Sequence, residues 1–226
     1  MKLIFSILFI LGCGFFSNAQ DAAALLREAG NKLSEGSVSV SDLLTHPSYL
    51  NLHPETGFRQ LVKQYAGTTP IKIATTQEPG KKIKVLGQVK NSANQPLAAV
   101  LVYVYQTDSK GWYAADRPHV GGNEGDRRHA RLFGYVKTDK EGKFELQTIK
   151  PSGYPSTDLP AHIHVEILDL DGYRPLITEF LFDDDERLTG EIRSRAFGSG
   201  FLLAKPEKTN SPFEQLFSYT LVLQKK

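Results

Sequence analysis

The sequence has almost no cysteine: its 226 residues contain one, Cys13, in an apolar run near the N-terminus. A single thiol cannot close an internal disulfide, so a packed core must hold the fold. The chain also lacks an excess of either charge, because 27 basic residues stand against 25 acidic ones and leave a formal net charge of +2. This balance gives no reason to expect a nucleic-acid partner.

The apolar run itself, at residues 3–16 after Lys2, is too short to predict a membrane span. A small-residue site ends at Ala19, so residues 1–19 are predicted to be a signal peptide that is cleaved after Ala19. The mature protein is then secreted or periplasmic and contains no cysteine. Two alternatives stay open: residues 10–13 (ILGC) form a lipoprotein box whose Cys13 carries a lipid anchor, or the run is an uncleaved anchor.

The next part of the chain, residues 20–80, is predicted to be a helical N-terminal extension with a linker. Residues 21–35 carry apolar side chains at spacings of three and four, and Gly36 can end that helix. A second short helix is predicted to begin with Thr56 as its cap. Residues 68–82 are rich in Thr, Pro, Gly and Lys, which is typical of a linker or strap.

From residue 81 to residue 226 the pattern changes to short strands without intervening helices. The expected strands are residues 83–89, 100–106, 132–137, 143–149, 161–168, 176–182 and 217–223. This spacing predicts a mainly β fold, an antiparallel β-sandwich with the short helical extension in front of it. A long polar segment, residues 114–131, interrupts the strands, and loops of that length are usually functional or disordered.

One of these strands carries the first candidate site. His162 and His164 stand two residues apart in Pro-Ala-His-Ile-His, so both imidazoles share one face of the strand while Ile163 lies on the other. Two neighbouring imidazoles make half of a metal site. Tyr154 lies just upstream in a Pro-Ser-Gly-Tyr-Pro turn, which can bring its phenol back over the same face.

These motifs stand in an order that resembles the intradiol ring-cleavage dioxygenases. The order is a Gly-x-Tyr ending at Tyr113, a Thr-Asp-x-x-Gly hairpin, the Pro-x-x-Tyr turn and His-x-His, over roughly residues 80–182. The resemblance implies a non-haem Fe(III) bound by Tyr113, Tyr154, His162 and His164. Fe(III) is a hard ion, and a phenolate oxygen is a hard ligand that such an ion keeps deprotonated.

The resemblance also implies the reaction. A small aromatic diol displaces the Tyr154 phenolate, which takes up a substrate proton while Tyr113 stays bound. O2 then attacks the activated ring, which opens between its two hydroxylated carbons. Both oxygen atoms enter the diacid product, and no external reductant is needed.

Two positions depart from the pattern of the family. Leu159 stands where an arginine usually precedes Pro-Ala-His, and Glu179 stands where a glutamine is common. Losing a cation and gaining an acid beside the substrate weakens the stabilisation of developing negative charge. Glu179 is then expected to accept a proton or to select another substrate. Arg131, with Arg127 and Arg128, can hold a substrate carboxylate or form a solvated loop face.

Two other functions remain open from the sequence. One is a non-catalytic β-sandwich binding module of the prealbumin or carboxypeptidase-regulatory kind, and the other is an iron-binding relative with weak or altered catechol activity. His53 and Glu55 are expected to serve turn and cap roles. Residues 183–186 (DDDE) are expected to be a solvated acidic turn, because the spacing of an EF-hand loop is absent. The oligomeric state stays open, a homo-oligomer included.

Overall fold

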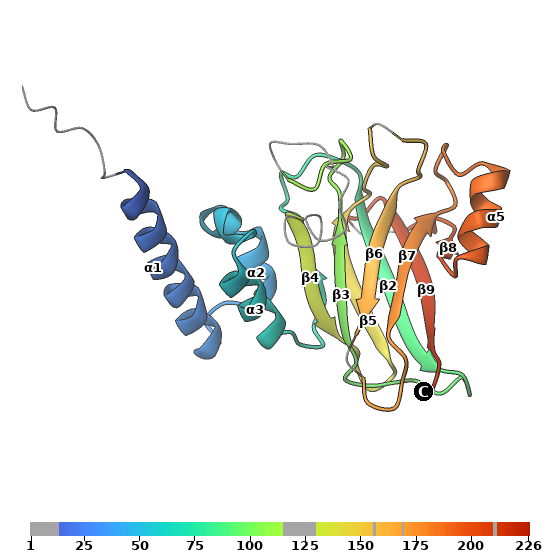
Figure 1. Ribbon diagram of the computed structural model, residues 1–226, viewed down its shortest axis with the longest axis horizontal. Coiled ribbons are helices and arrows are strands. Elements are labelled where there is room, and N and C mark those ends of the chain that lie inside the picture. Colours follow the sequence, from blue (N-terminus) through green and yellow to red (C-terminus); the bar gives the residue numbers. More distant parts are fainter. Residues whose placement is uncertain (1–13, 115–129, 156, 169, 210–211) are drawn as a thin grey trace, which may run out of the picture.

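The computed structural model describes residues 14–114, 130–155, 157–168, 170–209 and 212–226, with side chains from residue 21 onward (Figure 1). The signal peptide and Cys13 therefore stay predictions. The same holds for the roles of Arg127 and Arg128 in the polar segment, which lie outside the described residues. Within the described residues, no helix combines the length and apolarity needed to cross a bilayer.

The chain begins with a helical extension at one end of the molecule (Figure 1). Its elements are α1 (Gly14–Ser34), α2 (Val40–Thr45), the 3-10 helix η1 (Pro47–Leu52) and α3 (Thr56–Gln64). Ser39 caps α2 through a reciprocal pair of hydrogen bonds with Asp42, a short-range signal that the sequence analysis missed. The predicted cap at Thr56 is wrong by one residue: Glu55 is the N-cap of α3 and makes no side-chain capping bond.

Two β-sheets form the body of the protein. One has four strands in the order β1-β5-β2-β9, and the other has five in the order β4-β3-β6-β7-β8. Their bounds are β1 (Ile71–Lys72), β2 (Lys82–Asn91), β3 (Leu101–Gln106), β4 (Leu132–Lys137), β5 (Lys143–Ile149), β6 (His162–Ile167), β7 (Leu176–Phe182), β8 (Leu202–Ala204) and β9 (Gln215–Leu223). Helix α5 (Gly190–Gly198) links β7 to β8.

The mainly β prediction is confirmed, but the prediction of antiparallel sheets is wrong at three edges. β1 runs parallel to β5, β9 runs parallel to β2, and β8 runs parallel to β7. Parallel neighbours need a crossover connection rather than a hairpin, and α5 supplies one of these. Short-range alternation predicts strands but carries no information about such long connections, which is why the direction of these edge strands was missed.

The two sheets pack against each other through aromatic side chains. Phe180 of β7 stacks on Tyr219 of β9 with ring centroids 4.0 Å apart, and Phe182 meets Phe217 edge-on at 4.8 Å. The Tyr219 hydroxyl also donates a hydrogen bond to the backbone oxygen of Leu181 at 2.7 Å. Large rings that are buried in this way contribute much of the apolar area that stabilises a core.

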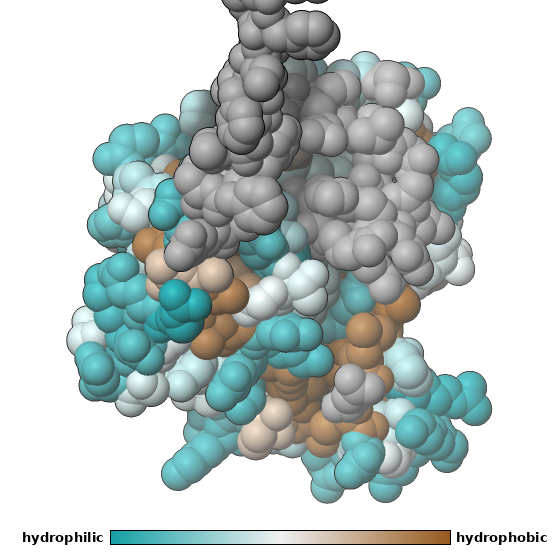
Figure 2. All heavy atoms as spheres, turned by 60° about the vertical axis from the view of Figure 1, so that its left-hand side comes forward, coloured by the Kyte–Doolittle hydropathy of each residue, from teal (hydrophilic) through white to brown (hydrophobic). Residues whose placement is uncertain are grey.

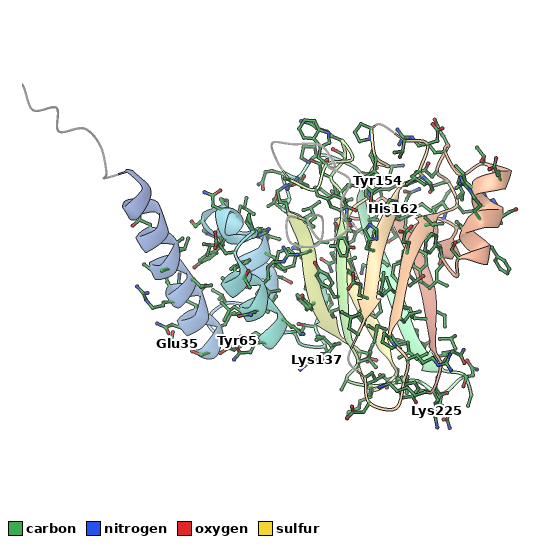
Figure 3. The ribbon with its side chains drawn as sticks, viewed as in Figure 1. Glu35, Tyr65, Lys137, Tyr154, His162 and Lys225 are labelled. Atoms are coloured by element: carbon green, nitrogen blue, oxygen red, sulfur yellow. The ribbon has the colours of Figure 1, made fainter. Side chains whose placement is uncertain are left out.

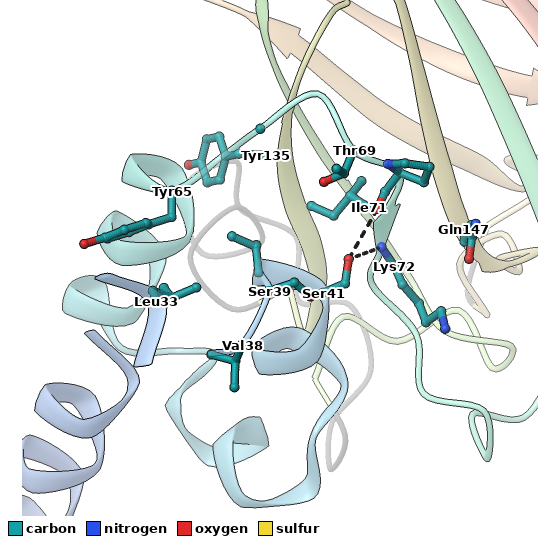
Figure 4. Close-up of a pocket in the computed structure, with 13 residues that line it drawn as sticks. Leu33, Val38, Ser39, Ser41, Tyr65, Thr69, Ile71, Lys72, Tyr135 and Gln147 are labelled. Atoms are coloured by element: carbon teal, nitrogen blue, oxygen red, sulfur yellow. Dashed lines mark hydrogen bonds between the residues drawn. The ribbon is translucent and has the colours of Figure 1, made fainter. Parts of the chain in front are cut away.

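The extension shares this core instead of forming a separate one. Leu43, Leu44, Phe58 and Val62 belong to the same buried cluster as the sheet residues. The segment that was predicted to be a linker contributes strand β1 to the sheet, and α2 is joined to it by Ser41, whose hydroxyl accepts from the backbone N–H of Lys72 at 2.9 Å (Figure 4). The domain boundary near residue 80 stays a prediction.

A cavity of about 470 Å³ lies where the extension meets the body (Figure 4). Its lining includes Leu33, Val38 and Tyr65 from the extension, and Tyr135 and Gln147 from the sheets. In the view of Figure 2, with the end that carries the extension turned forward, hydrophobic side chains appear in hollows between hydrophilic ones. No His, Cys, Asp or Glu is among the described lining residues of this cavity.

Candidate metal centre

The two histidines lie on β6, in the middle of the five-stranded sheet. β6 pairs with β3 on one side and β7 on the other, so backbone hydrogen bonds hold it along both edges. His164 stands opposite Tyr105 of β3 and Glu179 of β7. The Tyr105 ring stacks on the His164 imidazole with centroids 4.5 Å apart. The orientation of His164 therefore follows from the sheet itself.

Tyr113 comes from the loop that follows β3. Asp108 shapes this loop, because its Oδ1 accepts from the backbone N–H groups of Lys110 at 2.8 Å and Trp112 at 3.0 Å. Gly111 has a positive φ of 80°, which favours glycine, and a Cβ at this position would collide with the backbone oxygen of Gly153. The loop of Tyr113 thus packs directly on the loop of Tyr154.

The segment that connects β7 to α5 holds the Tyr154 loop near both of its ends. Arg187 Nη1 donates to the backbone oxygens of Tyr154 at 3.1 Å and Leu159 at 3.4 Å. Asp185 Oδ2 accepts from the backbone N–H of Ala161 at 2.9 Å. Residues 183–186 form the predicted acidic turn, with Asp184 and Glu186 exposed, and Asp185 in addition anchors the loop that carries a candidate ligand.

Four polar atoms converge where these loops meet the end of β6, near the labelled Tyr154 and His162 in Figure 3. Tyr113 Oη lies 2.7 Å from Tyr154 Oη and 2.7 Å from His164 Nε2. Tyr154 Oη lies 3.0 Å from His162 Nε2 and 3.4 Å from His164 Nε2. Both phenols are buried, at 4% and 8% exposed for Tyr113 and Tyr154. The structure thus brings together all four residues that the resemblance implied.

The chemistry of this donor set fits a ferric ion. His162 Nδ1 lies 2.8 Å from the backbone oxygen of Pro160, which can only accept, so Nδ1 carries the proton and Nε2 presents its lone pair to the cluster. Two phenol oxygens and two imidazole nitrogens suit a hard, highly charged iron ion. Tyr113, Tyr154, His162 and His164 are therefore the residues that could hold it.

Glu179 lies beside His164, its neighbour across the β6–β7 pair. Its Oε1 is 3.5 Å from His164 Nδ1, on the opposite edge of the ring from Nε2. Ligand atoms of His162, His164 and Glu179 all lie within 4.8 Å of one another. Burial raises the pKa of the Glu179 carboxyl above its usual value. A carboxylate at this place orients the ligand imidazole, as outer partners of metal-bound histidines commonly do.

A cavity of about 330 Å³ opens beside the cluster. Tyr154, His162 and Glu179 form one wall, while Ile192, Arg195 and Ala196 of α5 are among the residues that form another. Leu159 also lines it and is 42% exposed. Arg195 is the one arginine or lysine in this described lining. Helix α5 was not predicted from the sequence, although Thr189, which caps it, was an available signal.

Arg131 points to protein carboxylates and does not line this cavity. Its guanidinium binds Glu78 in a two-pronged ion pair, with N–O distances of 2.6 and 2.7 Å, and lies 3.5 Å from Asp108 Oδ2. The structure therefore gives Arg131 internal partners in place of the predicted substrate carboxylate. An arginine guanidinium forms the same two-pronged pair with a protein carboxylate as with a substrate carboxylate. The sequence alone could not show which of these partners Arg131 has.

Comparison with known proteins adds an independent observation. A family model described as Dioxygenase matches residues 60–225. The chain is 26% identical over 164 residues to the chlorocatechol 1,2-dioxygenase of Rhodococcus opacus, an alignment that covers 65% of this chain and 61% of that protein. It is 31% identical over 121 residues to the protocatechuate 3,4-dioxygenase beta chain of Burkholderia cepacia, covering 48% of each.

Solved structures show the same architecture. The dioxygenase domain of a dioxygenase–carbohydrate-binding fusion from Streptomyces sp. SirexAA-E superposes with a TM-score of 0.53 at 25% identity, over 71% of this chain and 90% of that one. Hydroxyquinol 1,2-dioxygenase from Pseudomonas putida DLL-E4 has a TM-score of 0.55 at 22% identity, over 71% and 61% of the two chains. At that identity the second likeness shows the fold alone. The alignments to the curated relatives above span 61% or less of their lengths.

Proposed function

The chain belongs to the intradiol ring-cleavage dioxygenase family, and on that premise we propose that it is a non-haem ferric enzyme that cleaves a catechol-type ring with O2. The observation that carries the proposal is the convergence of Tyr113 Oη, Tyr154 Oη and the Nε2 atoms of His162 and His164 within 2.7–3.4 Å contacts. A β-sandwich binding module would have no need for this donor set.

The proposed reaction breaks the carbon–carbon bond between the two hydroxylated ring carbons. Both atoms of O2 enter the product, which is a diacid, so no external reductant is consumed. When bound, the ferric ion supplies electron withdrawal from a chelating diol and so prepares the ring for O2. The protein must place the diol beside the four ligands and accept its protons.

Tyr154 is the proposed acceptor of a substrate proton. It lines the 330 Å³ cavity, whereas Tyr113 is not among the described lining residues. A diol that enters from this cavity meets Tyr154 first, and a tyrosine phenolate that leaves the metal is a base that can take up a phenolic proton. This asymmetry supports different roles for the two tyrosines.

The rest of the cavity favours an aromatic substrate. Leu181, Ile192 and Phe201 supply apolar surface for the flat ring. Leu159 offers no charge where the family usually has an arginine, but Arg195 reaches the same cavity from α5. A cation there stabilises negative charge that develops on the substrate. We therefore propose that Arg195 supplies part of what Leu159 cannot.

Purified protein reconstituted with iron tests the function. We expect a wine-red colour from tyrosinate-to-iron charge transfer, oxygen uptake with members of a catechol panel, and a ring-opened diacid product. A red protein that takes up no oxygen would favour the iron-binding relative with altered activity. A folded protein that binds no iron and has no colour would favour the binding module.

We also propose that the enzyme acts outside the cytoplasm, after removal of residues 1–19. The proposal is supported by the positive charge of Lys2 near the N-terminus, the apolar run that follows it and the small-residue cleavage site that ends at Ala19. Intact mass of the protein purified from its natural host separates the alternatives. A chain that begins at Gln20 agrees with the proposal, whereas a lipid-modified Cys13 at the new N-terminus contradicts it.

A further inference from the structure

His53 of the helical extension is deeply buried, although it lies far along the chain from the metal centre. It is 2% exposed, and its ring stacks on Phe58 at 5.3 Å and meets Phe133 edge-on at 5.5 Å. A buried imidazole loses its hydration, so its position needs a compensating partner. The turn or cap role expected for His53 is confirmed, because it lies in a turn and is the C-cap residue of η1, and the burial of its ring points to a further role.

The partner of His53 leads directly to a candidate iron ligand. His53 Nδ1 lies 2.6 Å from the backbone oxygen of Arg131. Because a carbonyl oxygen only accepts, Nδ1 must be the donor. The backbone N–H of Arg131 in turn donates to the backbone oxygen of Tyr113 at 2.8 Å. Two consecutive hydrogen bonds thus connect the extension to Tyr113.

Arg59 of α3 strengthens the same connection. Its Nη1 donates to the backbone oxygens of His53 at 3.0 Å and Ala130 at 3.1 Å. The guanidinium lies 3.7 Å from the centre of the Phe133 ring, and Arg59 is 9% exposed. The backbone oxygens of residues 130 and 131 are therefore both held by side chains of the extension, in a buried environment where such bonds are strong.

The side chain of Arg131 reaches the same tyrosine loop by a second route. It is paired with Glu78 and lies near Asp108. Asp108 holds the backbone N–H of Trp112, the residue next to Tyr113. Residue 131 is thus tied to the Tyr113 loop through both its backbone and its guanidinium.

We propose that His53 is a positioning residue for Tyr113, and that the helical extension is part of the scaffold of the metal centre. His53 fixes the backbone at residue 131, which fixes the backbone of Tyr113 and hence where its phenol oxygen lies. This inference rests on the proposed function, since it takes Tyr113 as an iron ligand. It assigns a task to the extension, whose helices contribute none of the four ligands.

Substitution of His53 in the full iron-loaded protein tests the proposal. His53→Leu removes the donor, whereas His53→Asn keeps an N–H close to the position of Nδ1. His46→Gln is the matched control, because His46 is an exposed histidine of the same extension. We expect His53→Leu to shift the tyrosinate-to-iron band and to weaken iron binding by up to about tenfold, the lower end for outer partners of metal ligands. His53→Asn should restore the band, and His46→Gln should leave it unchanged.

The outcomes separate this inference from the proposed function. A wild-type band that persists unchanged in His53→Leu would overturn the positioning role alone. Wild-type protein with neither iron nor band would overturn the proposed function and this inference with it. Where His53→Leu yields no folded protein, His53→Gln replaces it, because its N–H lies one bond too far out; a shifted band supports the proposal and a wild-type band contradicts it.

Discussion

The two histidines and the two tyrosines of the metal centre are held in different ways. His162 and His164 project from a central strand, so the backbone ladders of β3 and β7 set their positions. Tyr113 and Tyr154 sit on loops that depend on a few side-chain hydrogen bonds to the backbone, from Asp108 within the first loop and from Arg187 to the second. A strand needs no remote helper to present a side chain, whereas a loop must be held against its own conformational freedom.

The two pairs of ligands should therefore differ in how much their positions respond to remote substitutions. The positions of the two histidines should tolerate changes outside the sheet, since many backbone hydrogen bonds fix the strand that carries them. The tyrosine half should respond to side chains far from the iron, among them Arg187 and His53. The same looseness suits the proposed chemistry, in which Tyr154 must give up its position to an incoming diol.

The largest effect is expected from His162→Ala, which removes a ligand from the rigid half. No neighbouring strand residue can supply a nitrogen at that place, so iron binding should fall by more than the roughly 10–100-fold that outer partners cost. Metal analysis after dialysis measures the loss. His46→Ala serves as the control, and a His162→Ala protein that kept its full iron content would contradict the ligand assignment.

Acid should act through the extension. Burial lowers the pKa of His53 from 6.5 to about 4, so between these values the unfolded chain binds a proton that the folded chain does not. Stability is therefore complete above about pH 6.5 and is lost as the pH falls toward 4, by on the order of 3 kcal/mol. The free energy of unfolding, measured with denaturant at several pH values in this range, should change less steeply with pH in His53→Asn than in wild type. An equal change in both proteins would show that His53 does not cause the pH dependence.

Arg187→Ala should loosen Tyr154 without touching the histidines. It removes the donor to the Tyr154 and Leu159 backbone oxygens, so we expect roughly tenfold weaker iron binding and a shifted charge-transfer band. Arg193→Ala is the matched control, because Arg193 pairs with Asp183 in the same region and, among the described residues, donates no bond to the Tyr154 loop. If both variants behaved alike, the effect would belong to the region in general and not to the loop.

The smallest effect is expected from Arg195→Leu, which changes the cavity wall and neither half of the ligand set. Iron content and colour should stay as in wild type, while kcat/KM with a catechol should fall by about tenfold or less, below the hundredfold that a buried preorganised donor costs. Arg195→Lys keeps a cation and should recover much of the rate. A variant with undiminished kcat/KM would remove Arg195 from the proposed substrate contacts.

Several parts of this protein could be predicted from the sequence. The strands at residues 132–137, 143–149 and 176–182 were predicted to the residue, because alternating side chains report the period of a strand directly. The shared face of His162 and His164 follows from the same period. Tyr113 and Tyr154 were found through the order of motifs, which a family keeps even when the intervening chain varies.

Other parts depended on contacts between distant segments, which no local pattern contains. The parallel edge strands, the α5 wall with Arg195, the bond of Arg187 to the Tyr154 loop and the burial of His53 all join residues brought together by the path of the chain. Arg131 is the clearest example, since an arginine near a site looks the same in the sequence whether its partner is a substrate carboxylate or Glu78.

By itself, the sequence determined the strand period and the pair of histidines on one face, because these follow from backbone geometry and residue type within a few positions. The four candidate ligands were identified from the resemblance of its ordered motifs to a family. Only the tertiary structure decided what holds the ligands in place. A hydrogen bond such as that from His53 to Arg131 spans 78 residues, and its existence depends on every turn and packed layer between them.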